Sequence, residues 1–481
     1  MQNFIWESNK FSKTAVLVFL LSMGIALLTS NWLFMGIPFF LMFCFVLVLN
    51  WKLAYWILLA SVPISITFYF FNDSLSTSLP DEPIMWMMLL VGVFVIAHQP
   101  QRIKKEWLSH PLILMIGLQF IWMLIAIAFS SNVLLSVKFG LAKIWFLSSF
   151  LVLPYLVFKE KKDFKLGFIL FFIGVFITTL IIFARHALIG FDFLKIYKAI
   201  GELYQNHVDY STVLSMLFPA MCATVPLTKK WPWYARVLWL LVILFFLPAI
   251  YLTYARAAIL ALLFASVIYL AIRWKLVNWV MPLFYVAVIC LLSFMIRNNK
   301  YIDFRPNYDH TFMHFTFTDH IIATFRGEDM SSMERLYRWV AGARMSKEHP
   351  IVGYGPNTFY YNYKPYAVTS FRTYVSRNLE HSTSHNYFLY MLVEQGWPAL
   401  ILYGLLVMLF FYIAQKTYHR FSPGFYRQAT IAVATMFAAG FVNNFFSELI
   451  ENHKVGALFY LSISLLVILD LKSRKEANPL D

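Results

Sequence analysis

The sequence predicts an all-α membrane protein, a polytopic transmembrane helical bundle of about 12–14 spans with one large loop region on the outer side. Three observations support this prediction. Hydrophobic residues make up 60% of the 481 residues, and charged residues only 13%. Apolar runs of about 20 residues, each long enough to cross a ~30 Å hydrocarbon core, recur along the chain. Basic residues gather in every second connection between these runs.

Candidate spans can be placed along the whole chain, and their number falls to twelve or thirteen if an early pair is re-entrant or merged. Lys10 and Lys13 precede the first run without a small-residue cleavage site, which predicts an uncleaved first span. The candidate spans are 14–29, 32–49, 53–71, 83–98, 111–130, 133–157, 164–184, 208–226, 232–252, 255–272, 277–296, 397–415, 427–446 and 455–471.

The charges of the connections predict the orientation. Basic connections alternate with connections such as the acidic stretch 72–82. Because basic loops stay in the cytoplasm, both termini are expected there and the segment 297–384 outside. The net charge of +15 then reflects cytoplasmic loops beside membrane lipids, and no nucleic-acid partner is expected. The basic connections contain Lys52, Arg102, Lys104, Lys105, Lys159, Lys161, Lys162, Lys165, Lys229, Lys230, Arg236, Arg273, Lys275, Lys416, Arg420, Arg427, Lys472, Arg474 and Lys475.

This pattern divides the chain into three parts. Residues 1–296 hold the first group of transmembrane helices, 297–384 form the large outer loop with helices of the catalytic site, and 385–481 hold the C-terminal transmembrane helices. The loop is rich in arginine and histidine. Chemistry that needs water, protons and anions is therefore expected in or beside this loop.

Several basic residues lie at unusual places. Arg256 ends a tight hairpin on the expected outer side, where the positive-inside rule makes basic residues rare. It is therefore a functional candidate. The structural alternative is that its side chain snorkels to the lipid headgroups. Lys138 and Lys143 lie within an apolar span, where they could reach anions or interfaces, and Lys143 could equally snorkel. In the loop, Arg335 and Arg338 share one helical face with Trp339, which predicts either an anion site or a solvated basic face.

His385 opens the segment that re-enters the membrane. A neutral imidazole at the outer mouth of a helix can take a proton from a hydroxyl, as a general base does. His381 is expected to be a surface or capping residue. Upstream, Gly353 and Gly355 predict a tight turn or a close backbone approach.

A metal site is the alternative interpretation of the loop histidines. Their spacing fits no compact zinc pattern, and neither a Cys partner nor His-Glu-x-x-His accompanies them. Gly-rich nucleotide loops and a nucleophile-elbow serine are also missing from the sequence. The prediction is therefore no metal and no cofactor. The ligands considered are His310, His314, His320, Asp309 and Asp319.

Four segments together resemble the O-antigen ligase and O-antigen polymerase superfamily of bacterial glycosyltransferases. The first is His385-Asn386, followed after nine residues by Gly396. The others are the arginine–aromatic helix 335–339 with the His-Pro-x-x-Gly-x-Gly stretch 349–355, the hairpin 253–256, and Asn206-His207. The resemblance implies metal-independent, inverting transfer of a glycan from undecaprenyl pyrophosphate to a lipid A–core sugar hydroxyl.

The resemblance also implies roles and a location. His385 would be the general base, and Arg256 and Arg335 would hold the pyrophosphate and stabilise its charge as it leaves. The protein would be a multi-pass protein of the bacterial inner (cytoplasmic) membrane with its active site facing the periplasm. Substrate binding is assigned to Arg338, Asn386, Asn206, His207 and Lys138.

Other functions stay open at this point. The ligase pattern continues with a second glycine where this chain has Ala399, and a following Gly-Thr is missing. A polymerase or a protein O-oligosaccharyltransferase of the same superfamily is therefore an alternative, and another glycan an alternative acceptor. A transporter or flippase would need paired charges or broken helices near the bilayer midplane. A structural scaffold is favoured only if the arginines and His385 point apart.

Overall fold

The computed structural model describes residues 17, 19–29, 36–38, 41, 47, 50–70, 75–304, 317–326, 328–371 and 383–477. The chain divides into two compact units, Met1–Ala60 and Ser61–Asp481. The first unit contains the apolar helix Phe19–Thr29 and nearly all of α3, Trp51–Ser61. All contacts discussed below lie within the second unit.

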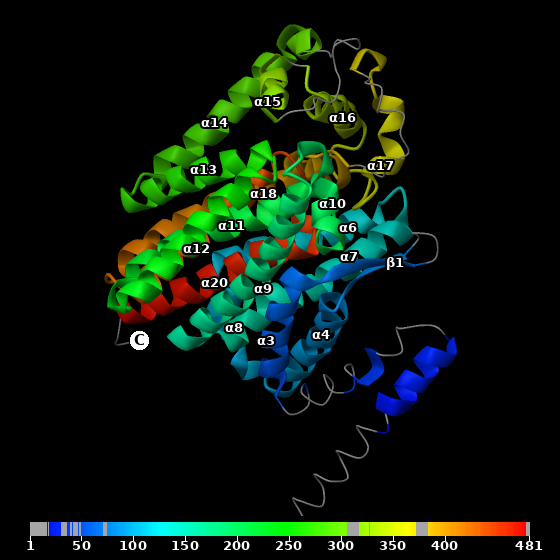
Figure 1. Ribbon diagram of the computed structural model, residues 1–481. Coiled ribbons are helices and arrows are strands. Elements are labelled where there is room, and N and C mark those ends of the chain that lie inside the picture. Colours follow the sequence, from blue (N-terminus) through cyan, green and yellow to red (C-terminus); the bar gives the residue numbers. More distant parts are fainter. Residues whose placement is uncertain are drawn as a thin grey trace, which may run out of the picture. The chain divides into compact units, whose positions relative to one another are not determined.

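The described part of the second unit is dominated by helices (Figure 1). Its one strand pair, β1 and β2, is antiparallel, with Ile66 opposite Leu79. The elements are η2 Val62–Ile64, β1 Ile66–Phe70, β2 Leu75–Leu79, α4 Asp81–His98, η3 Pro100–Arg102, α5 Lys105–Leu108, α6 Pro111–Ala128, α7 Val133–Leu147, the π-helical turn η4 Ser148–Val152, α8 Leu153–Val157, α9 Lys161–Leu188, η5 Phe193–Lys195, α10 Ile196–Ile200, η6 Gly201–Leu203, α11 His207–Thr224, η7 Val225–Lys230, α12 Trp233–Tyr251, α13 Arg256–Arg273, α14 Val277–Ile296, η8 Arg297–Phe304, α15 Phe317–Arg326, α16 Met330–Glu348, α17 Phe359–Asn362, η9 Lys364–Tyr366, η10 Thr369–Phe371, α18 Tyr387–Arg420, α19 Phe425–Asn443, η12 Leu449–Glu451 and α20 His453–Ala477.

Within the described residues, ten helices are long and apolar enough to cross a membrane. They confirm the predicted all-α polytopic bundle, and each coincides with one of the predicted spans. α19 forms where the span 427–446 was expected, but Arg427 and Gln428 in its first turn make it less apolar than those ten. It packs mainly against α11 and α13. The predicted spans 14–29 and 32–49 lie only partly within the described residues.

The predicted span 53–71 is wrong. The helix α3 ends at Ser61, and the chain continues through η2 into β1. Pro63 lacks the N–H that would continue the helix, and its ring disfavours helical backbone before it. The following Ile66-Thr67-Phe68 run is rich in residues that favour strands, and it pairs with β2.

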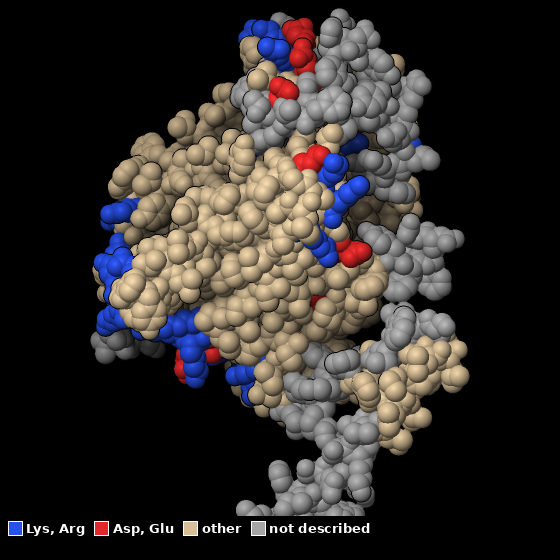
Figure 2. Space-filling model, viewed as in Figure 1, with Lys and Arg blue, Asp and Glu red and all other residues tan. Residues whose placement is uncertain are grey.

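Charge and burial are arranged as a membrane bundle requires. α20 is almost wholly enclosed, with 94% of its apolar window buried, whereas α14 has only 6% buried. Figure 2 shows a broad face without charged side chains, bordered by a basic edge where α20 ends. Such a face suits contact with lipid tails, and the basic edge agrees with the predicted cytoplasmic side.

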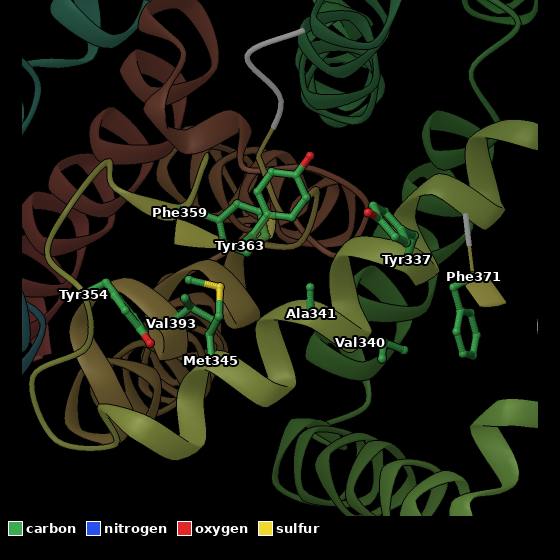
Figure 3. Close-up of a cluster of buried hydrophobic side chains, with 9 residues drawn as sticks. All are labelled: Tyr337, Val340, Ala341, Met345, Tyr354, Phe359, Tyr363, Phe371 and Val393. Carbon is green, nitrogen blue, oxygen red and sulfur yellow. The ribbon is translucent and has the colours of Figure 1, made fainter. Parts of the chain in front are cut away.

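Between α14 and α18, the loop region has a small core of its own. Residues from α16, from the stretch after it and from α18 pack together (Figure 3). This packing fixes α16, whose other face carries the predicted arginines. The buried members are Tyr337, Val340, Ala341, Met345, Tyr354, Phe359, Tyr363, Phe371 and Val393.

Candidate functional site

The connection 444–452, between α19 and α20, joins the elements of the candidate site. The Asn444 carbonyl accepts a hydrogen bond from the Tyr387 N–H at 2.8 Å. The Phe445 carbonyl accepts one from Asn386 Nδ2 at 3.1 Å, and the Phe446 carbonyl accepts one from Arg335 Nε at 3.2 Å. The N-terminal end of α18 and the arginine face of α16 are thereby held against one short connection.

Arg256 and Arg335 converge, although they are far apart in the sequence. Arg256 is the first residue of α13, and Arg335 lies in the second turn of α16. Both donate to the Ser331 hydroxyl, from Arg256 Nη2 at 2.9 Å and from Arg335 Nη1 at 3.1 Å. The two guanidinium groups, which the resemblance assigns to one pyrophosphate, therefore lie close together.

A buried carboxylate accompanies this pair. Asp329 Oδ2 accepts from Arg256 Nη2 at 2.8 Å, and from the Ser332 N–H at 2.9 Å as the N-cap of α16. Arg256 also donates to the Thr324 hydroxyl. Burial and the Arg256 charge lower the pKa of Arg335 to about 10, so Arg335 remains protonated at neutral pH. Two guanidinium groups beside one carboxylate leave a positive charge that favours an anion.

The rest of this helical face also points to the site. Trp339 Nε1 donates to the Ser384 carbonyl at 2.9 Å, directly before His385. Arg338 forms a 3.4 Å ion pair with Glu334, one turn earlier in α16. The shared face of Arg335, Arg338 and Trp339 is therefore confirmed, and it is packed against the protein rather than solvated.

His385 lies in a constrained position just before the N-terminal end of α18. Its φ of 49° is in the left-handed region, unusual for a residue with a Cβ atom. Its backbone N–H lies close to the Glu448 carboxylate and favours the ionised form of Glu448. Burial, together with the charges of Arg335 and Arg338, lowers the pKa of His385 to about 3. The imidazole is therefore neutral throughout the physiological pH range.

This pKa predicts the pH dependence of any proton transfer to His385. Because the pKa of His385 in the folded protein lies below its ordinary value of about 6.5, acidification should not protonate His385 until the pH approaches 3. We expect kcat/KM for transfer to show no fall with an apparent pKa near 6.5 between roughly pH 5 and 8. Initial rates across this range test it, and a decline centred near 6.5 would contradict the environment described for His385.

The residues predicted to bind substrate lie in different parts of the structure and make different contacts. Arg338 belongs to the cluster around His385. Asn386 is the N-cap of α18, accepting from the Leu389 N–H at 3.0 Å, and Asn206 is the N-cap of α11, accepting from the Val208 N–H at 2.8 Å. His207 lies edge-on to Tyr197, with ring centroids 5.4 Å apart. The two asparagines thus have structural roles that the sequence interpretation did not include.

The lysines of α7 are placed differently from one another. Lys138, the predicted substrate residue, is exposed. Lys143 instead turns inward and forms a 2.6 Å ion pair with Glu451. The snorkelling interpretation of Lys143 is therefore wrong, because its ammonium group pairs with a carboxylate of the connection 444–452.

The motif glycines bring two backbones together. Trp397 N–H donates to the Pro350 carbonyl at 2.9 Å, and Gly355 N–H donates to the Glu394 carbonyl at 2.9 Å. A Cβ atom on Gly353 would lie 2.3 Å from the Glu394 carbonyl carbon, and one on Gly396 would lie 1.9 Å from the Ile351 oxygen. The predicted close backbone approach is confirmed, and its partner is the helix break at Gly396.

Gly396→Ala should prevent normal folding. Gly396 has φ 78° and ψ −177°, a conformation essentially restricted to glycine, which would cost about 1–3 kcal/mol before the clash with Ile351. We expect a marked loss of monodisperse protein and a lower Tm in detergent. Gly404→Ala is the matched control in the same helix, since its Cβ would meet only Tyr285 at 3.9 Å. Equal stability of the two variants would contradict this account.

Two of the five residues considered as metal ligands, Asp319 and His320, lie within the described residues. His310, His314, Asp309 and also His381 lie outside the described residues. Within the described part of the chain, no group of three or more His, Cys, Asp or Glu side chains could hold a metal ion.

Sequence reasoning missed the acidic members of the site. Asp329, Glu448 and Glu451 contact the predicted arginines, histidine segment and lysine, respectively. The sequence does set two of these residues, Glu448 and Glu451, apart. The outer connection contains Glu448 and Glu451 where the neighbouring spans offer no acidic residue before Asp470.

One comparison with known proteins identifies a family. Residues 239–404 match the sequence model of the family described as O-antigen ligase. The matched stretch contains Arg256, Arg335 and His385, the residues around which the site is built. No curated protein matches the chain. The chain is a multi-pass membrane protein, and its residues 239–404 are similar to the O-antigen ligase family.

Proposed function

We propose that this enzyme moves a glycan from undecaprenyl pyrophosphate to a sugar hydroxyl of lipid A–core, at the periplasmic face of the bacterial inner membrane. The main support is the convergence of Arg256 and Arg335 on Ser331, beside a neutral His385. Two permanent cations suit a diphosphate, and a neutral imidazole suits a hydroxyl that must lose its proton.

In the proposed reaction, the acceptor oxygen attacks the anomeric carbon of the donor sugar from the face opposite the pyrophosphate. The new glycosidic bond forms as the bond to the pyrophosphate oxygen breaks, so the configuration inverts. His385 takes the hydroxyl proton. Arg256 and Arg335 stabilise the negative charge that develops on undecaprenyl pyrophosphate. Asp329 keeps the Arg256 fork oriented through its 2.8 Å ion pair.

The proposed periplasmic position follows from the ends of the helices. α13 begins at Arg256 and α18 begins directly after Asn386, while the basic connections lie at the opposite ends of these helices. Helix N-termini carry partial positive charge, which adds to the attraction for a pyrophosphate. A donor anchored in the outer leaflet would present its diphosphate at this level.

The substrate class can be tested in cells. In a deletion strain of the source bacterium, we expect lipid A–core without attached polymer, together with accumulated long carrier-linked glycan. Complementation with the wild-type chain should restore the polymer. Lipid A–core bearing a single repeat unit would instead identify a polymerase, and normal lipopolysaccharide with unglycosylated proteins would identify a protein O-oligosaccharyltransferase. Either result would overturn the ligase proposal.

A further inference from the structure

A cavity with both polar and apolar lining residues lies beside the His385 segment, and neither Arg256 nor Arg335 lines it. Its volume is about 240 Å³. It is smaller than the roughly 300–1,000 Å³ that holds drug-sized ligands, so it suits a single small ring. Phe139, Ala142, Phe146 and Ile450 provide apolar walls. The polar lining consists of Lys143, Asn357, Thr383, Tyr390, Glu448 and Glu451.

A fixed ion pair forms one wall. Lys143 Nζ lies 2.6 Å from Glu451 Oε2 and donates to the Tyr460 hydroxyl at 3.3 Å. The Tyr387 hydroxyl donates to the other oxygen, Glu451 Oε1, at 3.0 Å. The side chains of Lys143 and Glu451 are 11% and 19% exposed. Because both charged groups are held from several sides, this wall is preorganised.

Glu448 lies where the cavity meets the candidate catalytic site. It accepts a hydrogen bond from the Thr383 hydroxyl on Oε1, and the nearby His385 backbone N–H favours its ionised form. Its second oxygen, Oε2, is buried and has no hydrogen-bond partner among the described residues. Burial raises the pKa of Glu448. A buried carboxylate oxygen without a donor is costly, so it marks a position where a ligand hydroxyl would be stabilising.

The charges select the kind of ligand. Two carboxylates, Glu448 and Glu451, line the cavity with one lysine, and that lysine is already paired. Among the described lining residues, no cation is left unpaired for a phosphate or pyrophosphate, so this cavity does not favour an anion. A neutral polyhydroxylated ring could donate hydroxyls to the carboxylates, accept from Asn357 or Lys143, and place its apolar edge against Phe139.

We infer that this cavity binds one sugar ring of the glycan acceptor, with Glu448 Oε2 and the Lys143–Glu451 pair as its recognition groups. The inference rests on the proposed function, because it gives the acceptor a place distinct from the arginine pair that would hold the donor. Thr383 lines the cavity two residues before His385. A bound ring can therefore extend the reacting hydroxyl towards the imidazole.

Steady-state kinetics test this assignment. The protein is reconstituted in liposomes with undecaprenyl-pyrophosphate-linked glycan, and purified lipid A–core serves as the acceptor probe. For Glu448→Gln we expect the KM for lipid A–core to rise about tenfold or more, because a charge-assisted hydrogen bond is lost, while the KM for the donor stays unchanged. The double variant Lys143→Met/Glu451→Gln removes both charges together. It should likewise raise the KM for lipid A–core and leave the KM for the donor unchanged. Glu202→Gln, at an exposed glutamate on the same side, is the matched control.

A chemical block avoids dependence on variants that fail to fold. Ala142→Cys places a small thiol on the cavity wall, and a maleimide is added after purification of the folded protein. We expect labelling to raise the KM for lipid A–core, and soluble core oligosaccharide to slow labelling; identically treated wild-type protein is the control. If wild type transfers glycan but neither Glu448→Gln nor the label alters the acceptor KM, the cavity assignment is wrong. If wild type transfers no glycan, the proposed function itself fails.

Discussion

His385→Ala is expected to lower the rate of glycan transfer by about 10²–10⁴-fold. In the proposed mechanism His385 takes the proton of the acceptor hydroxyl, and its surroundings keep the imidazole neutral. Alanine carries a Cβ atom as histidine does, so the substitution adds no new steric contact at a φ of 49°. The protein should therefore remain folded and inserted. Transfer rates in proteoliposomes, normalised to folded protein from size-exclusion chromatography, measure the effect.

The control for this variant is His98→Ala. His98 is exposed at the end of α4 predicted to face the cytoplasm, so its loss should leave transfer unchanged. Two results would rule out the general-base role. One is full activity of the His385→Ala enzyme, and the other is a loss of activity that merely follows loss of the protein from the membrane.

Arg335→Lys and Arg256→Lys should each reduce kcat by about 10²–10³-fold, although the positive charge is kept. Arg335 uses Nε for the Phe446 carbonyl and Nη1 for Ser331, and Arg256 bridges Ser331 and Asp329. A lysine ammonium is a single point of donation and cannot reproduce either fork. The expected signature is a fall in kcat larger than any rise in the donor KM, because the leaving-group charge develops in the transition state.

Arg273→Lys provides the matched control for the arginine variants. It changes the arginine at the other end of α13, where the side chain is exposed and, among the described residues, donates to the Tyr269 hydroxyl at 3.3 Å. We expect wild-type kinetics for this variant. If Arg335→Lys and Arg256→Lys also showed wild-type kcat, the shared grip on a pyrophosphate would be disproved.

The helical architecture could be predicted because it depends on local properties. Apolar runs of membrane length mark spans. The capping asparagines Asn206 and Asn386 are also local signals, but the prediction assigned them to substrate binding instead. The prediction failed where the conformation depends on pairing with another segment of the chain. Residues 66–70 are as apolar as a span, but they pair with β2 after Pro63 ends the helical conformation.

Of the candidate site, only the basic residues could be predicted from the sequence. Arg256 stood out because basic residues are rare on the outer side, Arg335 because it shares a helical face with Arg338 and Trp339, and His385 because it opens an apolar helix; the family resemblance grouped them. Asp329 gave no such sign, and the isolation of Glu448 and Glu451 between apolar spans did not reveal their partners. Their importance comes from contacts across distant parts of the chain, such as Glu448 with the His385 backbone, which periodicity cannot reveal.

Reconstituted transfer is the most direct test of the central claim, that the convergent arginines and His385 form a glycosyl-transfer site that works without metal. Purified protein in liposomes is supplied with undecaprenyl-pyrophosphate-linked glycan and lipid A–core, after exhaustive chelation. The account predicts glycan joined to lipid A–core with inverted anomeric configuration and release of equimolar undecaprenyl pyrophosphate, both abolished in His385→Ala and Arg335→Lys. Transfer that stops on chelation and returns with a divalent metal, or transfer that persists in both variants, would contradict it.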